Sequence, residues 1–165
     1  MSPVRFLRHA LQPQWWAMRA FPQATLTRLE AAIADSERQH AGELRFVVEA
    51  ALPPRHLLCG RSARERAVEL FSQLRVWDTE ANSGVLIYIQ LIDHQVEIVA
   101  DRGIDARVGH AFWESVCGRM QAAFRAGRFE AGALAALAEI TTALATHFPP
   151  GADNPNELPD RPLLL

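Results

Sequence analysis

Two apolar runs in residues 80–105 form the clearest pattern along the chain. The first, Val85–Ile92, is apolar on both faces of a strand, and the second, Val96–Ala100, is interrupted by one acidic residue. Because only a short turn around Asp93 and His94 separates the runs, we predict a β-hairpin. The first strand should lie in the centre of a sheet with helices on each face, and the second should end in a polar segment, residues 101–105, at the edge of the sheet.

The residues before the hairpin alternate between helical and extended patterns. Two capping-box sequences, Thr27–Glu30 and Ser62–Glu65, predict the starts of two helices. The first helix should run to about residue 40 and end at Gly42. Between the helices, Leu44–Leu52 predicts a strand, and residues 55–61 predict a loop.

After the hairpin, apolar residues at helical spacing predict helices over residues 107–126 and 130–147. Residues 154–165, which are interrupted by prolines, predict an extended tail. A helix joins the first two predicted strands, which favours a parallel right-handed crossover. We therefore predict an α/β fold, a three-layer α/β/α sandwich with a small mixed β-sheet that contains the central β-hairpin.

The chain divides into three parts on this pattern. Residues 1–24 form an aromatic and basic arm, residues 25–148 the α/β domain, and residues 149–165 the tail. Trp15 and Trp16 stand in the arm among three arginines and are candidates for contact with a partner or a membrane surface. Pro13 interrupts the arm, so the alternative is a lead-in segment packed across the domain.

Composition narrows the functional classes. The 165 residues carry a net charge of −2 with a pI near 6.3, which argues against a nucleic-acid-binding protein. All 17 basic residues are arginines, so mechanisms that need a lysine are excluded. No run reaches the roughly 18 apolar residues of a membrane span, and no signal peptide is recognisable, so we expect a cytoplasmic protein.

The two cysteines, Cys59 and Cys117, lie far apart in the sequence and without metal-ligand spacing. We expect buried free thiols, with a disulfide as the alternative.

Acidic and amide residues flank the hairpin. Glu80 and Asn82 precede it, and Asp101 and Asp105 follow it. Oxygen ligands of this kind suit Ca²⁺ or another divalent cation, which makes these four residues the candidate metal ligands. The alternative is that they shape turns and cap a helix.

Catalytic residues are not assigned by any pattern in the sequence. The histidines are scattered, and the chain contains no G-x-S-x-G sequence. We therefore favour a protein that is not an enzyme.

Several segments match the pattern of one known family. They are Leu44–Val48, Ala67–Phe71, Asn82–Tyr88, Val96–Ile104 and Phe124–Gly127 with Gly132. On these residues the chain resembles the TPM domain family over about residues 25–148, and it is most similar to soluble single-domain bacterial members. The resemblance implies an α/β/α sandwich, with Asn82 and Asp101 at loop positions where some members bind Ca²⁺.

The resemblance also suggests functions. Members are linked to the assembly or repair of membrane protein complexes, and plant members have been assigned acid phosphatase activity. We therefore expect an accessory or binding domain that acts with a protein partner, for example a membrane protein that would bring it to the membrane. A divalent-metal-dependent phosphatase that uses the loop acids is the alternative, and peripheral membrane contact through the arm is a third hypothesis.

Overall fold

The structure is a computed structural model, which describes Leu7, His9 and residues 15–151 and 154–165. The helices are α2 (Trp15–Ala20), α3 (Gln23–Glu37), α4 (Pro54–Leu58), α5 (Ala63–Gln73), α6 (Arg102–Val108), α7 (His110–Arg125) and α8 (Phe129–His147). The strands are β1 (Leu44–Glu49), β2 (Val85–Gln90), β3 (Gln95–Ala100) and β4 (Leu163–Leu164).

The sheet has the strand order β3-β2-β1-β4, and it confirms the predicted hairpin. β2 and β3 are antiparallel with Ile87 opposite Ile98, whereas β1 and β2 are parallel with Phe46 opposite Ile87. All six residues of β2 are buried, as its two apolar faces predict. β2 therefore lies inside the sheet, and β3 forms one edge.

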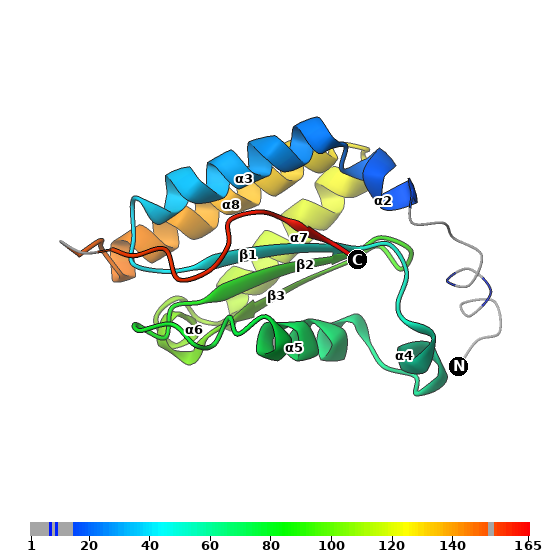
Figure 1. Ribbon diagram of the computed structural model, residues 1–165, viewed down its shortest axis with the longest axis horizontal. Coiled ribbons are helices and arrows are strands. Elements are labelled where there is room, and N and C mark those ends of the chain that lie inside the picture. Colours follow the sequence, from blue (N-terminus) through cyan, green and yellow to red (C-terminus); the bar gives the residue numbers. More distant parts are fainter. Residues whose placement is uncertain (1–6, 8, 10–14, 152–153) are drawn as a thin grey trace.

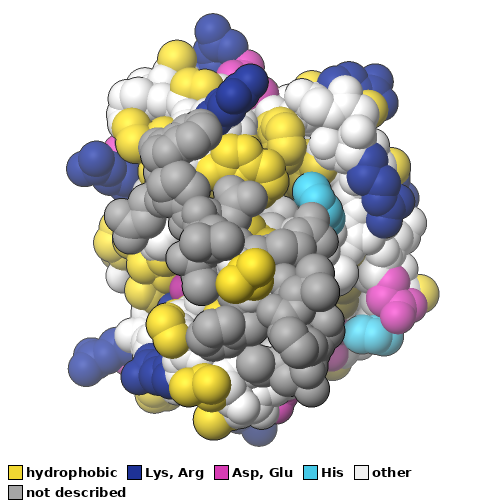
Figure 2. Space-filling view, turned by 90° about the vertical axis from the view of Figure 1, so that its right-hand side faces the viewer, with side chains coloured by type: hydrophobic (Ala, Val, Ile, Leu, Met, Phe, Trp, Pro, Cys, Tyr) yellow, Lys and Arg dark blue, Asp and Glu magenta, His cyan; other side chains and the backbone are white. Residues whose placement is uncertain are grey.

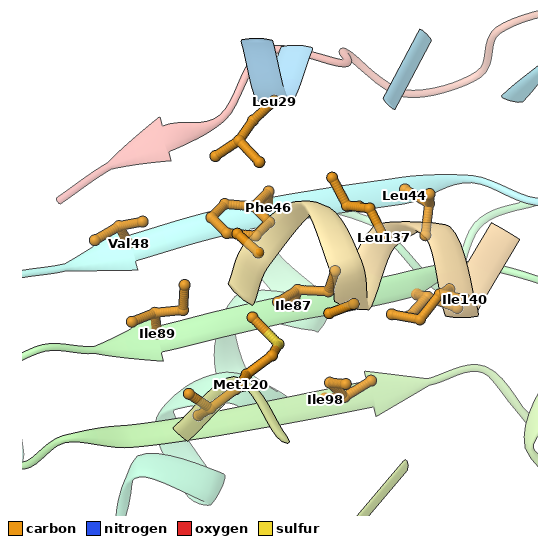
Figure 3. Close-up of a cluster of buried hydrophobic side chains, with 14 of the residues drawn as sticks. Leu29, Leu44, Phe46, Val48, Ile87, Ile89, Ile98, Met120, Leu137 and Ile140 are labelled. Carbon is orange, nitrogen blue, oxygen red and sulfur yellow. The ribbon is translucent and has the colours of Figure 1, made fainter. Parts of the chain in front are cut away.

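Helices cover both faces of the sheet, so the α/β sandwich is confirmed. Figure 1 shows α3, α7 and α8 on one face and α5 on the other. Side chains alternate along β2 between the two layers: Ile87 faces the larger core, whereas Leu86 and Tyr88 face α5. Figure 3 shows the larger core, in which Phe46 and Ile87 lie between side chains of the helices.

The hairpin turn is longer than predicted. β2 ends at Gln90, and the turn includes Leu91 and Ile92 as well as Asp93 and His94. Leu91 and Ile92 are buried although they belong to the turn. Because they are apolar, the sequence pattern assigned them to the strand. The side chain of Gln90 accepts a hydrogen bond from the Asp93 amide at 2.6 Å, which closes the turn.

Two predictions for α3 were wrong. The helix begins at Gln23 after Pro22, so Thr27 is an interior helix residue and caps nothing. It also ends at Glu37, well before Gly42. Gly42 is required for packing instead, because a Cβ atom there would lie 2.7 Å from a side-chain methyl group of Leu144.

The capping box at α5 was correct. Ser62 accepts a hydrogen bond from the Glu65 amide, and the Glu65 carboxylate accepts one from the Ser62 amide. The loop predicted over residues 55–61 was partly wrong, because Pro54–Leu58 forms α4. Proline is favoured in the first turn of a helix, where no internal hydrogen bond is lost.

The helix predicted over residues 107–126 corresponds to α7 (His110–Arg125), but α6, which precedes it, was not predicted. Asp101 caps α6, and Gly109, with a φ of 78°, separates α6 from α7. The C-terminal residues are extended, as predicted, but β4 also pairs with β1 in parallel. Both cysteines are free, but the expectation that both are buried was wrong, because Cys59 is exposed.

α8 is long and apolar enough to cross a membrane when judged by length and composition alone, and it is the single such helix among the described residues. This contradicts the expectation that no segment reaches that limit. The apolar composition has an explanation within the fold, because Ala133, Leu137, Ile140 and Leu144 of α8 lie in the larger core.

The central position of β2 gives a testable prediction. Replacing the fully buried Ile87 with alanine should lower the free energy of unfolding by about 2–5 kcal/mol, because it leaves a cavity between two layers. The matched control is Val68→Ala on α5, where the side chain is 48% exposed and the loss should stay within about 0.5 kcal/mol. Urea unfolding of both variants measures the difference, and equal losses would contradict this account of the core.

Candidate functional site at the loop edge of the sheet

The loops at one end of the strands bring together the residues before β2 and after β3. The Asp101 amide donates a hydrogen bond to the Gly84 carbonyl at 2.8 Å. Gly103, in the first turn of α6, lies against the preceding loop, because a Cβ atom there would be 2.4 Å from the Asn82 carbonyl oxygen. The residues before β2 and after β3 therefore form one surface, which we call the loop edge (residues 74–84 and 101–105).

Close backbone packing fixes this surface. A Cβ atom at Gly84 would lie 1.9 Å from the carbonyl oxygen of Val76, so only glycine fits there. The Thr79 hydroxyl accepts a hydrogen bond from the Ser83 amide at 3.1 Å, and the Ser83 hydroxyl donates to the Ala41 carbonyl at 3.0 Å. The loop before β2 is thereby tied both to itself and to the segment before β1.

The four predicted metal ligands have different surroundings. Asp101 is buried, and its Oδ1 accepts a hydrogen bond from the Arg102 amide at 2.7 Å, whereas its Oδ2 is buried without a hydrogen-bond partner. Asp105 is exposed, and its Oδ1 accepts a hydrogen bond from the Trp113 indole N–H at 2.9 Å. Glu80 and Asn82 are exposed.

Oxygen atoms of this kind are suitable ligands for a hard cation, but the acidic side chains do not cluster around one point. Among the described residues, no three His, Cys, Asp or Glu side chains lie close enough together to hold a metal ion. Amide and carbonyl oxygens also bind Ca²⁺, and the Ala81 and Asn82 carbonyl oxygens would lie 3.1 and 2.4 Å from a Cβ atom built on Gly103. Asp101, with its unpaired buried oxygen, is the carboxylate of this set that would hold such an ion.

The two tryptophans predicted to contact a partner belong to α2. This helix lies toward the end of the sheet opposite the loop edge (Figure 1). Trp16 is half-buried and packs against the larger core. The side chain of Trp15 lies outside the described residues.

Trp77 is a loop-edge residue that was not predicted from the sequence. Its side chain is 50% exposed, whereas the neighbouring Val76 is fully buried beneath Gly84. An indole is thus presented to solvent from a loop that packs closely against Gly84. The signal in the sequence was a tryptophan among polar residues between a helix and a strand.

The C-terminal residues dock beside the loop edge through buried carboxyl groups. Glu43 accepts hydrogen bonds from the amides of Glu157 and Leu158 at 3.1 and 3.0 Å. The Glu157 carboxylate in turn accepts a hydrogen bond from the Glu80 amide at 3.3 Å. The Arg45 guanidinium donates to the Pro159 carbonyl. The tail is therefore part of the surface next to the candidate site.

Glu37 lies within this docked region. Its Oε1 accepts a hydrogen bond from the Leu44 amide at 2.9 Å, and its Oε2 is buried. Burial, reinforced by the carboxylates of Glu43 and Asp160, raises the pKa of Glu37 to about 9. Glu37 is therefore protonated in the folded protein at neutral pH.

This protonation predicts a pH dependence of stability. Between the ordinary pKa of 4.5 and the folded pKa of about 9, the folded state holds a proton that the unfolded state lacks, so the free energy of unfolding falls as pH rises. Glu37→Gln imitates the protonated form and should remove this part of the slope. Unfolding at pH 5, 7 and 9 measures it, with Glu30→Gln on the same helix as the control. Parallel slopes for wild type and Glu37→Gln would contradict the raised pKa.

Comparisons with known proteins place the chain in a family. The chain is 28% identical to the BA42 protein of the psychrophilic bacterium Bizionia argentinensis, with a TM-score of 0.75 over 86% of this chain and 93% of that one. The N-terminal domain of a protein from P. gingivalis shares the fold at 16% identity, with a TM-score of 0.62 over 82% of this chain and 90% of that one.

A comparison with curated proteins finds no match. The family model of the TPM domain matches residues 18–143, which include the hairpin, the loop edge and most of α8. The chain therefore belongs to the TPM domain family.

Proposed function

We propose that this protein is a non-enzymatic accessory or binding domain, which engages a protein partner through the loop edge of its sheet. The observation that carries the proposal is the half-exposed indole of Trp77, which stands on a loop fixed by the contact between Val76 and Gly84. Tryptophans that are held rigidly at a surface commonly dominate the energy of protein interfaces.

A membrane protein is a suitable partner. Members of the family are linked to membrane protein complexes, and a domain of this kind would reach the membrane through its partner. Trp15 and Trp16 would provide a second contact. This contact would be separate from the loop edge, because α2 lies toward the other end of the sheet. The two contacts can be tested independently because they lie toward different edges of the sheet.

A pulldown from native lysate tests this proposal. Wild-type protein should recover a specific partner, and Trp77→Ala should reduce the recovery at least tenfold, because truncating an anchoring tryptophan commonly costs more than about 2 kcal/mol. Val68→Ala, which removes an exposed apolar side chain from α5, is the control and should recover the partner in full. A partner that is captured equally by wild type and Trp77→Ala would contradict binding through the loop edge.

Trp16→Ala tests the second contact in the same experiment. A loss with Trp16→Ala and none with Trp77→Ala would assign the partner to the α2 surface and would overturn the role of the loop edge.

The second candidate function is a divalent-metal-dependent phosphatase that uses Glu80, Asn82, Asp101 and Asp105. The buried, unpaired Oδ2 of Asp101 is the observation that favours it, because buried polar atoms in proteins usually have a partner and a cation would supply one here. A bound Ca²⁺ or other divalent cation would supply a Lewis acid for a phosphate ester. Asp101 would hold the ion, and Asn82 would contribute a carbonyl oxygen.

Calcium titration tests this second function. Asp101→Asn keeps an N-cap residue for α6 but removes the charge, so it should weaken Ca²⁺ binding at least tenfold without loss of fold. Asp78→Asn, in the same loop region, is the control and should bind as the wild type does. Calorimetry measures binding, and hydrolysis of p-nitrophenyl phosphate measures activity. Binding or hydrolysis that survives Asp101→Asn unchanged would contradict the role of Asp101.

A further inference from the structure

A large hollow lies at the end of the molecule opposite the loop edge. It has a volume of about 810 Å³ and is lined by Trp16, Arg19, Ala20, Leu91, His94, Phe124, Arg125, Gly127 and Phe129. We call it the aromatic groove. Figure 2 shows this end of the molecule, where hydrophobic side chains gather with basic ones around them. The groove is remote from the loop edge, and the proposed partner contact at Trp77 does not use it.

The wall of the groove is rigid and aromatic. Phe124 and Phe129 stack with their ring centroids 5.1 Å apart, and the ring of Phe21 packs edge-on against both. The close crossing of α7 and α8 fixes this pair, because a Cβ atom at Gly132 would lie 2.7 Å from the Ala123 Cβ and 3.1 Å from the Phe124 ring. The groove is therefore formed by the packing of the core.

Basic groups stand on the rim of this apolar wall. Arg19 projects from α2, Arg125 from the end of α7, and His94 from the hairpin turn, and all three are exposed. No carboxylate is among the described lining residues. Arg28 and Arg119, by contrast, are paired with Glu130 and Glu139 on the neighbouring helical surface. Arg19 and Arg125 form no ion pair with another described residue, which leaves their charge for an anion.

Size and chemistry together define a ligand. Small-molecule sites are typically concave, largely apolar and roughly 300–1,000 Å³ in volume, with a few polar groups that orient the ligand. We propose that the aromatic groove binds a small anionic amphiphile, a carboxylate carried on an apolar chain, with the chain against Phe124 and Phe129 and the carboxylate at Arg19 and Arg125. An arginine guanidinium can hold a carboxylate with two parallel hydrogen bonds.

Titration with dodecanoate, kept below its micelle concentration, tests the proposal on the full chain. Saturable one-to-one binding is expected, with NMR shift changes at the Trp16 indole and the Phe124 and Phe129 rings. Arg19→Glu combined with Arg125→Glu should weaken binding at least tenfold without unfolding the protein, because both side chains are exposed. Arg61→Glu, an exposed arginine in the loop before α5, is the control and should bind as the wild type does.

Two further titrations show whether the groove recognises the carboxylate, the apolar chain or a membrane surface. Dodecyltrimethylammonium has the same chain with a cationic head and should bind at least tenfold more weakly than dodecanoate. Vesicles of anionic phospholipid test whether the groove instead contacts a membrane surface. The proposal is overturned if dodecanoate does not saturate, if the cationic amphiphile binds equally, if Arg61→Glu loses as much affinity as the double variant, or if only the vesicles bind.

Discussion

The burial of β2 on both faces is the constraint on which the rest of the structure depends. A strand with Ile87 on one face and Leu86 and Tyr88 on the other cannot lie on a surface, so the sheet must be covered twice. The crossover through α5 covers one face, and α3, α7 and α8 cover the other. The hairpin follows from the same requirement, because β3 returns antiparallel to β2 and leaves the edge to a strand with one acidic residue.

Buried polar groups make the packing of these layers specific. On the α5 face, the Tyr88 hydroxyl donates to the Glu49 carboxylate at 2.6 Å, and Arg66 donates to the same carboxylate at 2.8 Å. These groups join β1, β2 and α5 in one network, and removing one partner would leave another charge or hydroxyl buried without compensation. Glu43 has an equivalent role for the tail, whose backbone amides it binds.

The fold separates two surfaces. At the loop edge, tight backbone contacts at Gly84 and Gly103 hold Asp101 and Trp77 in place. At the other end, the crossing of α7 and α8 holds the half-buried Phe124 and Phe129 rings beside exposed basic groups. At both surfaces a glycine allows close packing: Gly84 and Gly103 against loop carbonyl groups, and Gly132 of α8 against α7. The two surfaces are therefore held in place in the same way. The proposed partner contact and the proposed ligand groove therefore do not overlap.

The sequence alone determined the hairpin, the parallel crossover, the capping box at Ser62 and the family, because each depends on residues close together in the chain. It also indicated that Asn82 and Asp101 meet, since a hairpin brings its two ends to one edge. Only the tertiary structure decided which polar atoms stay unpaired, how β4 joins the sheet, and where Trp77 and the aromatic groove are exposed. Those features arise from contacts between distant segments, such as Glu43 with Leu158, whose energies no local pattern contains.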